Sequence, residues 1–219
     1  MKRYRFALMV GSSIMSLFVI TTGYTFKKTD AFPIDGKLNR NNYYQHTLNI
    51  KVMITDTSKK KELAVTRVFN VPVASLWKAW SDPEQVMKWW GPAGFTSPSC
   101  KMDFREGGIS LVCMRAPKEF GGQDMYNTWT YQKIVPMERI EFILNFSDKE
   151  GNKLDPAKMG IPPGVPQDVP HVITFKVLDD NTTEMKVTEY GYTSDQAVNI
   201  SKVGLEQCLD KMAAIFARN

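Results

Sequence analysis

A long amphipathic segment at the C-terminus constrains the fold more than any other feature of the sequence. From Thr193 to about Ala217, apolar side chains such as Leu205 and Leu209 recur at helical spacing. Thr193 and Gln196 form a predicted capping box at its start. A helix of about 23 residues is ~35 Å long, enough to cross a β-sheet. The sequence therefore predicts one helix that can cover a sheet alone.

Seven strand-like runs precede this helix. The first, residues 62–70, alternates apolar and polar side chains and is rich in β-branched residues. The other six fall into pairs separated by REGG, PME and DNT, and they read FTSPSCKMDF with GISLVCMRA, YNTWTYQKIV with RIEFILNF, and HVITFKVLD with TEMKVTEYG. Because short turns join consecutive strands, the predicted sheet is antiparallel.

Two short helices are predicted between the first and second strands. One has Pro72 in its first turn and carries an apolar stripe, and the next begins at the cap Asp82 and stops at Gly91. A seven-stranded sheet needs a cover for its apolar face, and the C-terminal helix is long enough to supply it. Residues 62–219 are therefore predicted to form an α+β helix-grip fold. In this fold a curved antiparallel sheet wraps the last helix, and a cavity is expected between them.

The N-terminus has the features of an export signal. Three basic residues precede an apolar stretch at residues 6–20, after which the chain turns polar. We expect residues 1–23 to be a signal peptide or a membrane anchor that tethers the protein through residues 6–20, and residues 24–61 to be a linker. The protein would then be exported or membrane-anchored. A translation start at Met53 would instead give a cytoplasmic protein.

Charge separates the two parts of the chain. Residues 1–61 hold 11 Lys/Arg and 3 Asp/Glu, which gives +8, and residues 62–219 hold 17 and 20, which gives −3. Nucleic-acid binding needs basic charge on the folded surface, so we predict no nucleic-acid partner. The cysteines leave two alternatives: Cys100 and Cys113 face each other across the predicted hairpin, or all three cysteines are buried thiols.

The predicted domain resembles the SRPBCC (START-like) superfamily. Within it, the chain is similar to bacterial homologues of the C-terminal domain of the activator of the ninety-kilodalton heat-shock chaperone's ATPase (AHSA-type). The residues that carry the resemblance are TRVFNVPVASLWKAWSDPEQVMKWWGPAGF at 66–95, CKMDFREGG at 100–108, CMRAP at 113–117, YQKIVPMERI at 131–140 and GLEQCLDKMA at 204–213. The chain departs from the family pattern at Leu205, where the family usually has Trp, and at Trp129, where it commonly has Gly. The resemblance implies an apolar ligand, or a chaperone partner and a role in the stress response.

Candidate ligand-cavity residues lie on the inward faces of these elements. They are Trp89, Trp90, Phe95, Ser110, Val112, Met114, Trp129, Tyr131, Met185, Val187, Leu205 and Leu209. The same pattern is typical of simple core packing, and both interpretations stay open. The Pro-rich segment between the fifth and sixth strands supplies Met159, Ile161 and Val165, either to close the pocket mouth or as part of an exposed loop.

The sequence offers little for catalysis. No His/Cys/Asp group has metal-ligand spacing, so no metal or cofactor is predicted, and no nucleophile motif accompanies His171. Three hypotheses follow. The domain binds an apolar or lipid-like small molecule without catalysis, it contacts a protein partner such as a chaperone, or it is an enzyme that uses Tyr131, Glu189 or His171 on a small organic substrate.

Overall fold

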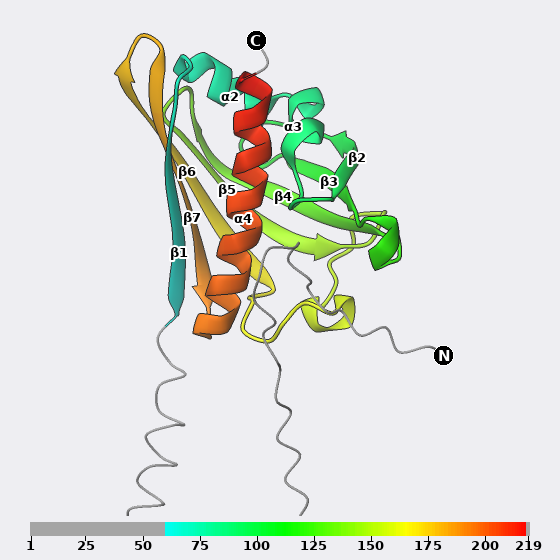
Figure 1. Ribbon diagram of the computed structural model, residues 1–219. Helices are drawn as coiled ribbons and strands as arrows, with labels where there is room; N and C mark the ends of the chain where they lie inside the picture. Colours follow the sequence, from blue (N-terminus) through cyan, green and yellow to red (C-terminus); the bar gives the residue numbers. More distant parts are fainter. Residues whose placement is uncertain (1–59, 218–219) are drawn as a thin grey trace, which may run out of the picture. The chain divides into compact units, whose positions relative to one another are not determined.

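The computed structural model describes residues 60–217 (Figure 1), and the predicted targeting segment and all but the last two residues of the predicted linker lie outside this range. The predicted order of elements is confirmed, with β1 beginning one residue earlier than expected and Pro72 at the N-cap of the first helix rather than in its first turn. The elements are β1 (Lys61–Phe69), α2 (Val73–Ser81), α3 (Pro83–Trp89), β2 (Thr96–Lys101), β3 (Ile109–Arg115), β4 (Asp124–Val135), β5 (Arg139–Ser147), β6 (Asp168–Asp179), β7 (Thr182–Tyr192) and α4 (Asp195–Phe216), with short 3-10 turns η2 (Lys118–Phe120) and η3 (Pro156–Met159).

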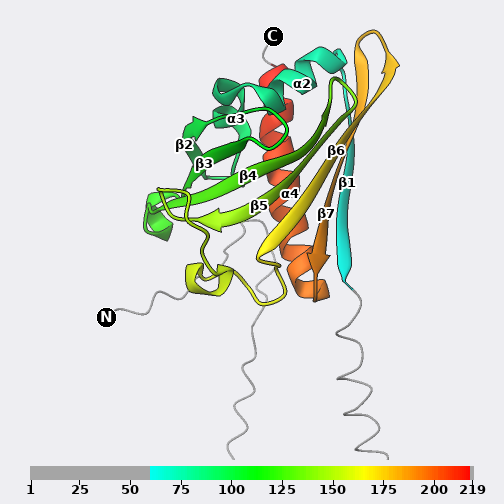
Figure 2. The same cartoon turned by 180° about the vertical axis from the view of Figure 1, so that it is seen from behind.

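The strands form one antiparallel sheet in the order β1-β7-β6-β5-β4-β3-β2. Neighbours in the chain are neighbours in the sheet, except that β1 pairs with β7. The helix α4 crosses one face of this sheet, and the opposite face of the sheet is turned toward the viewer in Figure 2. The α+β helix-grip prediction is therefore confirmed.

Helix α4 is fixed over one side of the sheet by packing and by a charged contact. Its main contacts are with β1, β7 and α3. Its buried face includes Leu205, Leu209 and Met212. At the rim of this interface, Arg67 of β1 pairs with Asp210 and donates a further hydrogen bond to a backbone carbonyl of the helix. Helix α2 also reaches this face of the sheet, because the ring of Trp80 packs against Trp129 of β4 and Phe142 of β5.

The predicted cap of α4 is wrong by one residue. Ser194 is the N-cap, and its Oγ accepts a hydrogen bond from the backbone N–H of Ala197 at 3.1 Å. Thr193 lies outside the helix, and its own N–H donates to the carbonyl of Gly164 at 2.9 Å. That bond docks the Pro-rich loop onto the start of the helix.

The loop between β5 and β6 is packed against the domain. Val165 contacts the hydrophobic core. A Cβ on Gly164 would lie 2.3 Å from Ser194 Oγ, so only glycine permits this close approach to α4. Through Gly164 and Val165 the loop packs against the start of α4 and the core, and closure of a pocket by this loop stays a prediction.

The cysteine pairing alternative is wrong. Cys100 lies opposite Val112, and Cys113 lies opposite Ser99, so the two thiols lie on opposite faces of the sheet. All three cysteines are free. Within residues 60–217, none of the helices has the length and apolar content needed to cross a bilayer.

Candidate functional site

An aromatic column runs across the inner face of the sheet. The rings of Trp129 on β4 and Phe142 on β5 stack with centroids 4.9 Å apart and an interplanar angle of 16°. Phe142 stacks in turn on His171 of β6 at 4.7 Å and 13°. At the other end, Trp90 meets Trp129 edge to face at 4.7 Å. The column thus connects the apolar rings of Trp90, Trp129 and Phe142 to the titratable ring of His171.

The column ends on a buried polar cluster. His171 lies directly opposite Glu189 in the β6–β7 ladder, and its Nε2 is 3.2 Å from Glu189 Oε1. Its Nδ1 is 2.9 Å from the carbonyl oxygen of Val169. The hydroxyl of Tyr192 donates to the second oxygen of Glu189. Both ring nitrogens of His171 thus face acceptor atoms, a carboxylate oxygen on one side and a backbone carbonyl on the other.

The environment of Glu189 favours its ionised form. Burial opposes ionisation, but the charge and hydrogen bond of His171, with the hydrogen bond of Tyr192, hold the pKa of Glu189 below its ordinary value. Burial, together with the neighbouring carboxylate, raises the pKa of Tyr192. The cluster therefore joins the Glu189 carboxylate to His171 and to the hydroxyl of Tyr192, and each of these side chains has a polar partner.

The lowered pKa of Glu189 predicts a dependence of stability on pH. A carboxylate with a lowered folded-state pKa contributes stability above its unfolded pKa, near 4.5, and loses it as pH falls through the folded value. We expect Glu189→Gln to flatten the decline of unfolding free energy below pH 4.5, measured by urea denaturation between pH 2.5 and 7. Parallel curves for variant and wild type would contradict this assignment.

A second polar pair lies between β3 and β4. Ser110 Oγ and the hydroxyl of Tyr131 are 3.1 Å apart, and both side chains are buried. The hydroxyl of Ser110 also accepts a hydrogen bond from the N–H of Asp103 at 3.2 Å. Burial raises the pKa of Tyr131, so its phenol stays protonated. The pair shares the inner face with the aromatic column, because Tyr131 contacts Phe142 edge to face.

Trp90 differs from the other buried tryptophans. Trp89 Nε1 donates to the carbonyl of Ala79 at 2.8 Å, and Trp129 Nε1 donates to Asn127 Oδ1 at 2.9 Å. Trp80 Nε1 lies 3.2 Å from Met185 Sδ. Trp90 is only 7% exposed, so water does not reach its Nε1, and this N–H has no hydrogen-bond partner. An unpartnered buried N–H is unusual and calls for an explanation.

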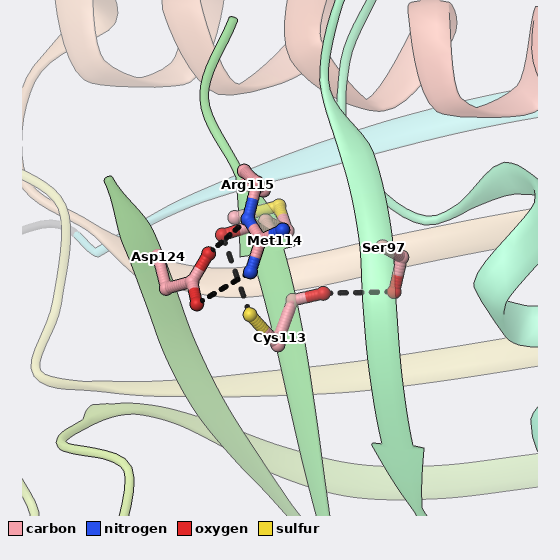
Figure 3. Close-up of polar contacts among 5 residues, drawn as sticks. All are labelled: Ser97, Cys113, Met114, Arg115 and Asp124. Atoms are coloured by element: carbon pink, nitrogen blue, oxygen red, sulfur yellow. Dashed lines mark hydrogen bonds and ion pairs between the residues drawn. The ribbon is translucent and has the colours of Figure 1, made fainter. Parts of the chain in front are cut away.

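Polar contacts hold the end of β3 that carries Met114 (Figure 3). Arg115 Nε and Nη2 donate to the two carboxylate oxygens of Asp124 at 2.6 and 2.9 Å, and this hydrogen-bonded pair lowers the pKa of Asp124. On the other side, Ser97 Oγ donates to the carbonyl of Cys113 at 2.8 Å. These contacts join β2, β3 and β4 and fix the position of Met114.

The comparison with protein families decides what kind of chain this is. The family model for "Activator of Hsp90 ATPase homolog 1-like protein" (AHSA1) matches residues 70–217. The chain belongs to this family. It is an AHSA1-type member of the SRPBCC superfamily, which confirms the resemblance drawn from the sequence.

Solved structures share the fold of this AHSA1-type domain. A crystal structure of a protein from Chromobacterium violaceum is 25% identical, covers 70% of this chain and 95% of that one, and has a TM-score of 0.56. A solution structure from Arthrobacter aurescens is 19% identical, covers 74% and 93%, and has a TM-score of 0.58. The AHSA1 protein from Silicibacter pomeroyi is 18% identical, covers 72% and 98%, and has a TM-score of 0.58. No curated protein compared with the chain matches it.

The predicted site residues all lie in the interior of the AHSA1-type domain or at its margin. Phe95 and Met114 are half-buried. The other ten are buried, namely Trp89, Trp90, Ser110, Val112, Trp129, Tyr131, Met185, Val187, Leu205 and Leu209. The structure brings Trp89, Trp90 and Trp129 together as one group and Ser110 and Tyr131 as another.

Three residues of the site were missed or only partly identified from the sequence. His171 and Glu189 were named separately as enzyme candidates, and neither their pairing nor the role of Tyr192 was predicted. Among residues 60–217, no group of three or more His, Cys, Asp or Glu side chains is placed to hold a metal ion. The site therefore consists of the aromatic column, the unpartnered Trp90 donor and the closed His171–Glu189–Tyr192 cluster.

Proposed function

We propose that the domain binds a largely aromatic small molecule beside Trp90, between the sheet and α4, and that the ligand carries a hydrogen-bond acceptor. The observation that supports this is the buried, unpartnered Nε1 of Trp90. Leaving a buried donor unsatisfied costs about 1–3 kcal/mol, which an acceptor on a ligand would recover. Membership of the AHSA1 family fits a ligand-binding domain.

The surroundings of Trp90 suit such a ligand. The ring of Trp129 meets it edge to face, and the half-buried side chains of Met114 and Phe95 lie close by, next to Gly91. Methionine adapts to ligands of different shape, and aromatic rings supply flat apolar surface. The ligand would therefore be recognised by stacking and by one directed hydrogen bond.

The proposal includes no chemical step. His171 is the natural general base of the site, but both of its ring nitrogens are engaged, one by Glu189 and the other by the Val169 carbonyl. A base must reach the proton it abstracts, and neither nitrogen is free to do so. The contacts of His171 thus support a structural role for the His171–Glu189–Tyr192 cluster, next to the proposed binding site.

A matched pair of ligands tests the proposed hydrogen bond. Fluorenone and fluorene share one flat ring system, and only fluorenone carries a carbonyl oxygen. We expect the full chain to bind fluorenone roughly fivefold more tightly than fluorene, as one net hydrogen bond implies. Trp90→Phe keeps an aromatic ring but removes the donor, so it should abolish this preference. Isothermal titration calorimetry measures all four dissociation constants.

The result can also count against the proposal. Equal affinity of the wild-type chain for the two compounds, or a preference that survives Trp90→Phe, would show that Trp90 donates no bond to the ligand. Trp77→Phe is the matched control, because Trp77 is half-buried and packs on Phe104 and Phe175 outside the column. It should leave the preference unchanged.

A protein partner is the second candidate function. The description of the matching family names activation of the Hsp90 ATPase, and this is the observation that favours it. Under this alternative, adding the chain to Hsp90 should raise the rate of ATP hydrolysis. The alternative also requires the domain and the chaperone to share a compartment, which a topology reporter fused after Asn219 would establish.

A further inference from the structure

The segment Trp90–Phe95, called the 90–95 segment below, connects α3 to β2 beside the proposed ligand site. It forms a compact turn in which the N–H of Phe95 donates to the carbonyl of Pro92 at 3.0 Å. Gly91 and Gly94 have positive φ angles of 98° and 83°. Glycine adopts such angles without strain, so the turn depends on these two residues.

Two side chains of α4 hold this segment. Lys211 Nζ donates to three backbone carbonyls, those of Gly91 at 2.9 Å, Phe95 at 3.0 Å and Trp90 at 3.4 Å. One helical turn earlier, Gln207 Oε1 accepts from the N–H of Ala93 at 3.1 Å. An ammonium has three donors, and here each has a carbonyl partner.

The charge of Lys211 is held in a partly desolvated place. Burial lowers the pKa of Lys211, while the neighbouring Cys208 acts in the opposite direction. Cys208 itself is a buried thiol, and burial raises its pKa to about 12. The three carbonyl contacts compensate the ammonium for lost hydration, because charge-assisted hydrogen bonds are about twice as strong as neutral ones.

The 90–95 segment lies over the side chains that the ligand would meet. A Cβ placed on Gly91 would be 3.1 Å from Phe95 Cβ and 3.5 Å from the side chain of Met114, so these three residues are in close contact. Trp90, with its unpartnered donor, begins the segment. Displacing residues 91–95 would uncover the side chains of Trp90 and Met114 without disturbing the sheet.

We propose that the 90–95 segment is the gate of the ligand site and that Lys211 is the positioning residue that holds it closed. This inference rests on the proposed function and adds the route by which a ligand reaches Trp90. Gln207 supports the same closed state. Release of these two side chains frees the segment to turn about its glycines, while α3 and β2 stay in place.

Hydrogen exchange of the tryptophan indole N–H groups tests the gate without any ligand. Trp90 Nε1–H is buried but has no hydrogen-bond partner, so its exchange with solvent reports opening of the segment. We expect Lys211→Met to speed this exchange roughly tenfold or more, since it removes three hydrogen bonds to a charged group. Gln207→Ala should speed it roughly fivefold, as the loss of one neutral hydrogen bond implies. The rates are measured by NMR on the full chain, with the Trp90 signal assigned from Trp90→Phe.

Internal controls separate the gate from a general loss of stability. The indole N–H groups of Trp89 and Trp129 donate to Ala79 and Asn127 and should exchange at unchanged rates in both variants. Lys202→Met, which removes a half-exposed lysine elsewhere on α4, should leave the Trp90 rate unchanged as well. If Trp90 exchange is unaltered in Lys211→Met and Gln207→Ala, or if all indoles accelerate together, the gate is ruled out.

Failure of the gate and failure of the proposed function have different signatures. A binding site without a gate would show fluorenone binding with unchanged Trp90 exchange in the Lys211 variant. A site that takes no such ligand would show no fluorenone binding in any variant, whatever the exchange rates. With both correct, Lys211→Met should also raise the association and dissociation rates of fluorenone by similar factors, measured by stopped-flow fluorescence.

Discussion

Replacing Glu189 by alanine is expected to lower the free energy of unfolding by about 3–5 kcal/mol, the cost of breaking a buried ion pair on one side. The substitution leaves His171 with a buried N–H facing no acceptor and deprives the hydroxyl of Tyr192 of its partner. For a domain of this size the loss corresponds to a fall in melting temperature of roughly 6–20 °C. Urea denaturation and thermal melting of the full chain measure both quantities.

Glu189→Gln is the matched control for this prediction. The amide oxygen can still accept from Tyr192, and the amide nitrogen can donate to the neutral form of His171, so the cluster keeps its hydrogen bonds. The expected loss is about 1–2 kcal/mol. Glu62→Ala, on the exposed face of β1, should change stability by less than about 0.5 kcal/mol. A loss in Glu189→Ala no larger than in Glu189→Gln would contradict a buried ion pair.

Trp129→Ala is expected to destabilise the domain by about 3–5 kcal/mol through loss of buried area and creation of a void. Trp129 is fully buried and contacts three other rings, those of Trp90, Phe142 and Trp80. Its removal interrupts the column and leaves the side-chain oxygen of Asn127 without its donor. Chemical denaturation of the full chain measures the loss.

Indole should rescue the Trp129→Ala variant. An apolar cavity the size of a tryptophan ring binds small aromatic molecules, and a ligand at 100 times its dissociation constant adds about 2.7 kcal/mol of stability. Wild type should gain nothing comparable at the same indole concentration. Trp77→Ala, at a half-buried position, serves as control and should show a smaller loss and no rescue. Equal stabilisation of both variants by indole would show that no defined cavity forms at Trp129.

The fold could be predicted from the sequence because the local pattern of each segment agrees with its place in the whole fold. The β-strands alternate, Pro72 and Asp82 mark helix starts, and one long helix can cover the sheet. The start of α4 was misplaced because Thr193 and Ser194 are both good N-caps, and the sequence alone does not choose between them. In the structure the hydroxyl of Ser194 accepts from Ala197 N–H.

The His171–Glu189 pair could not be read from the sequence for a different reason. A symmetric hairpin about the predicted turn at 180–182 would place His171 opposite Gly191. The actual turn is shorter, and the ladder shifts register between Val177 and Asp179, which moves Glu189 opposite His171. A β-bulge changes which residues meet but leaves no clear mark in the alternation of side chains.

The two departures from the family pattern can be understood together. The family usually carries a tryptophan where this chain has Leu205, and commonly glycine where it has Trp129. Both positions belong to one buried core cluster. Relative to that pattern, Trp129 adds more side-chain volume on β4 than Leu205 removes from α4, so the core gains volume on the side of the sheet.

Native mass spectrometry of the full chain, purified from its own cells, tests the central claim most directly. We predict a complex with one small aromatic molecule that is lost on denaturation and absent from the Met114→Trp variant, in which a larger ring fills the space beside Gly91. A wild-type chain that carries no small molecule, and whose melting temperature does not rise with fluorenone, would contradict the account.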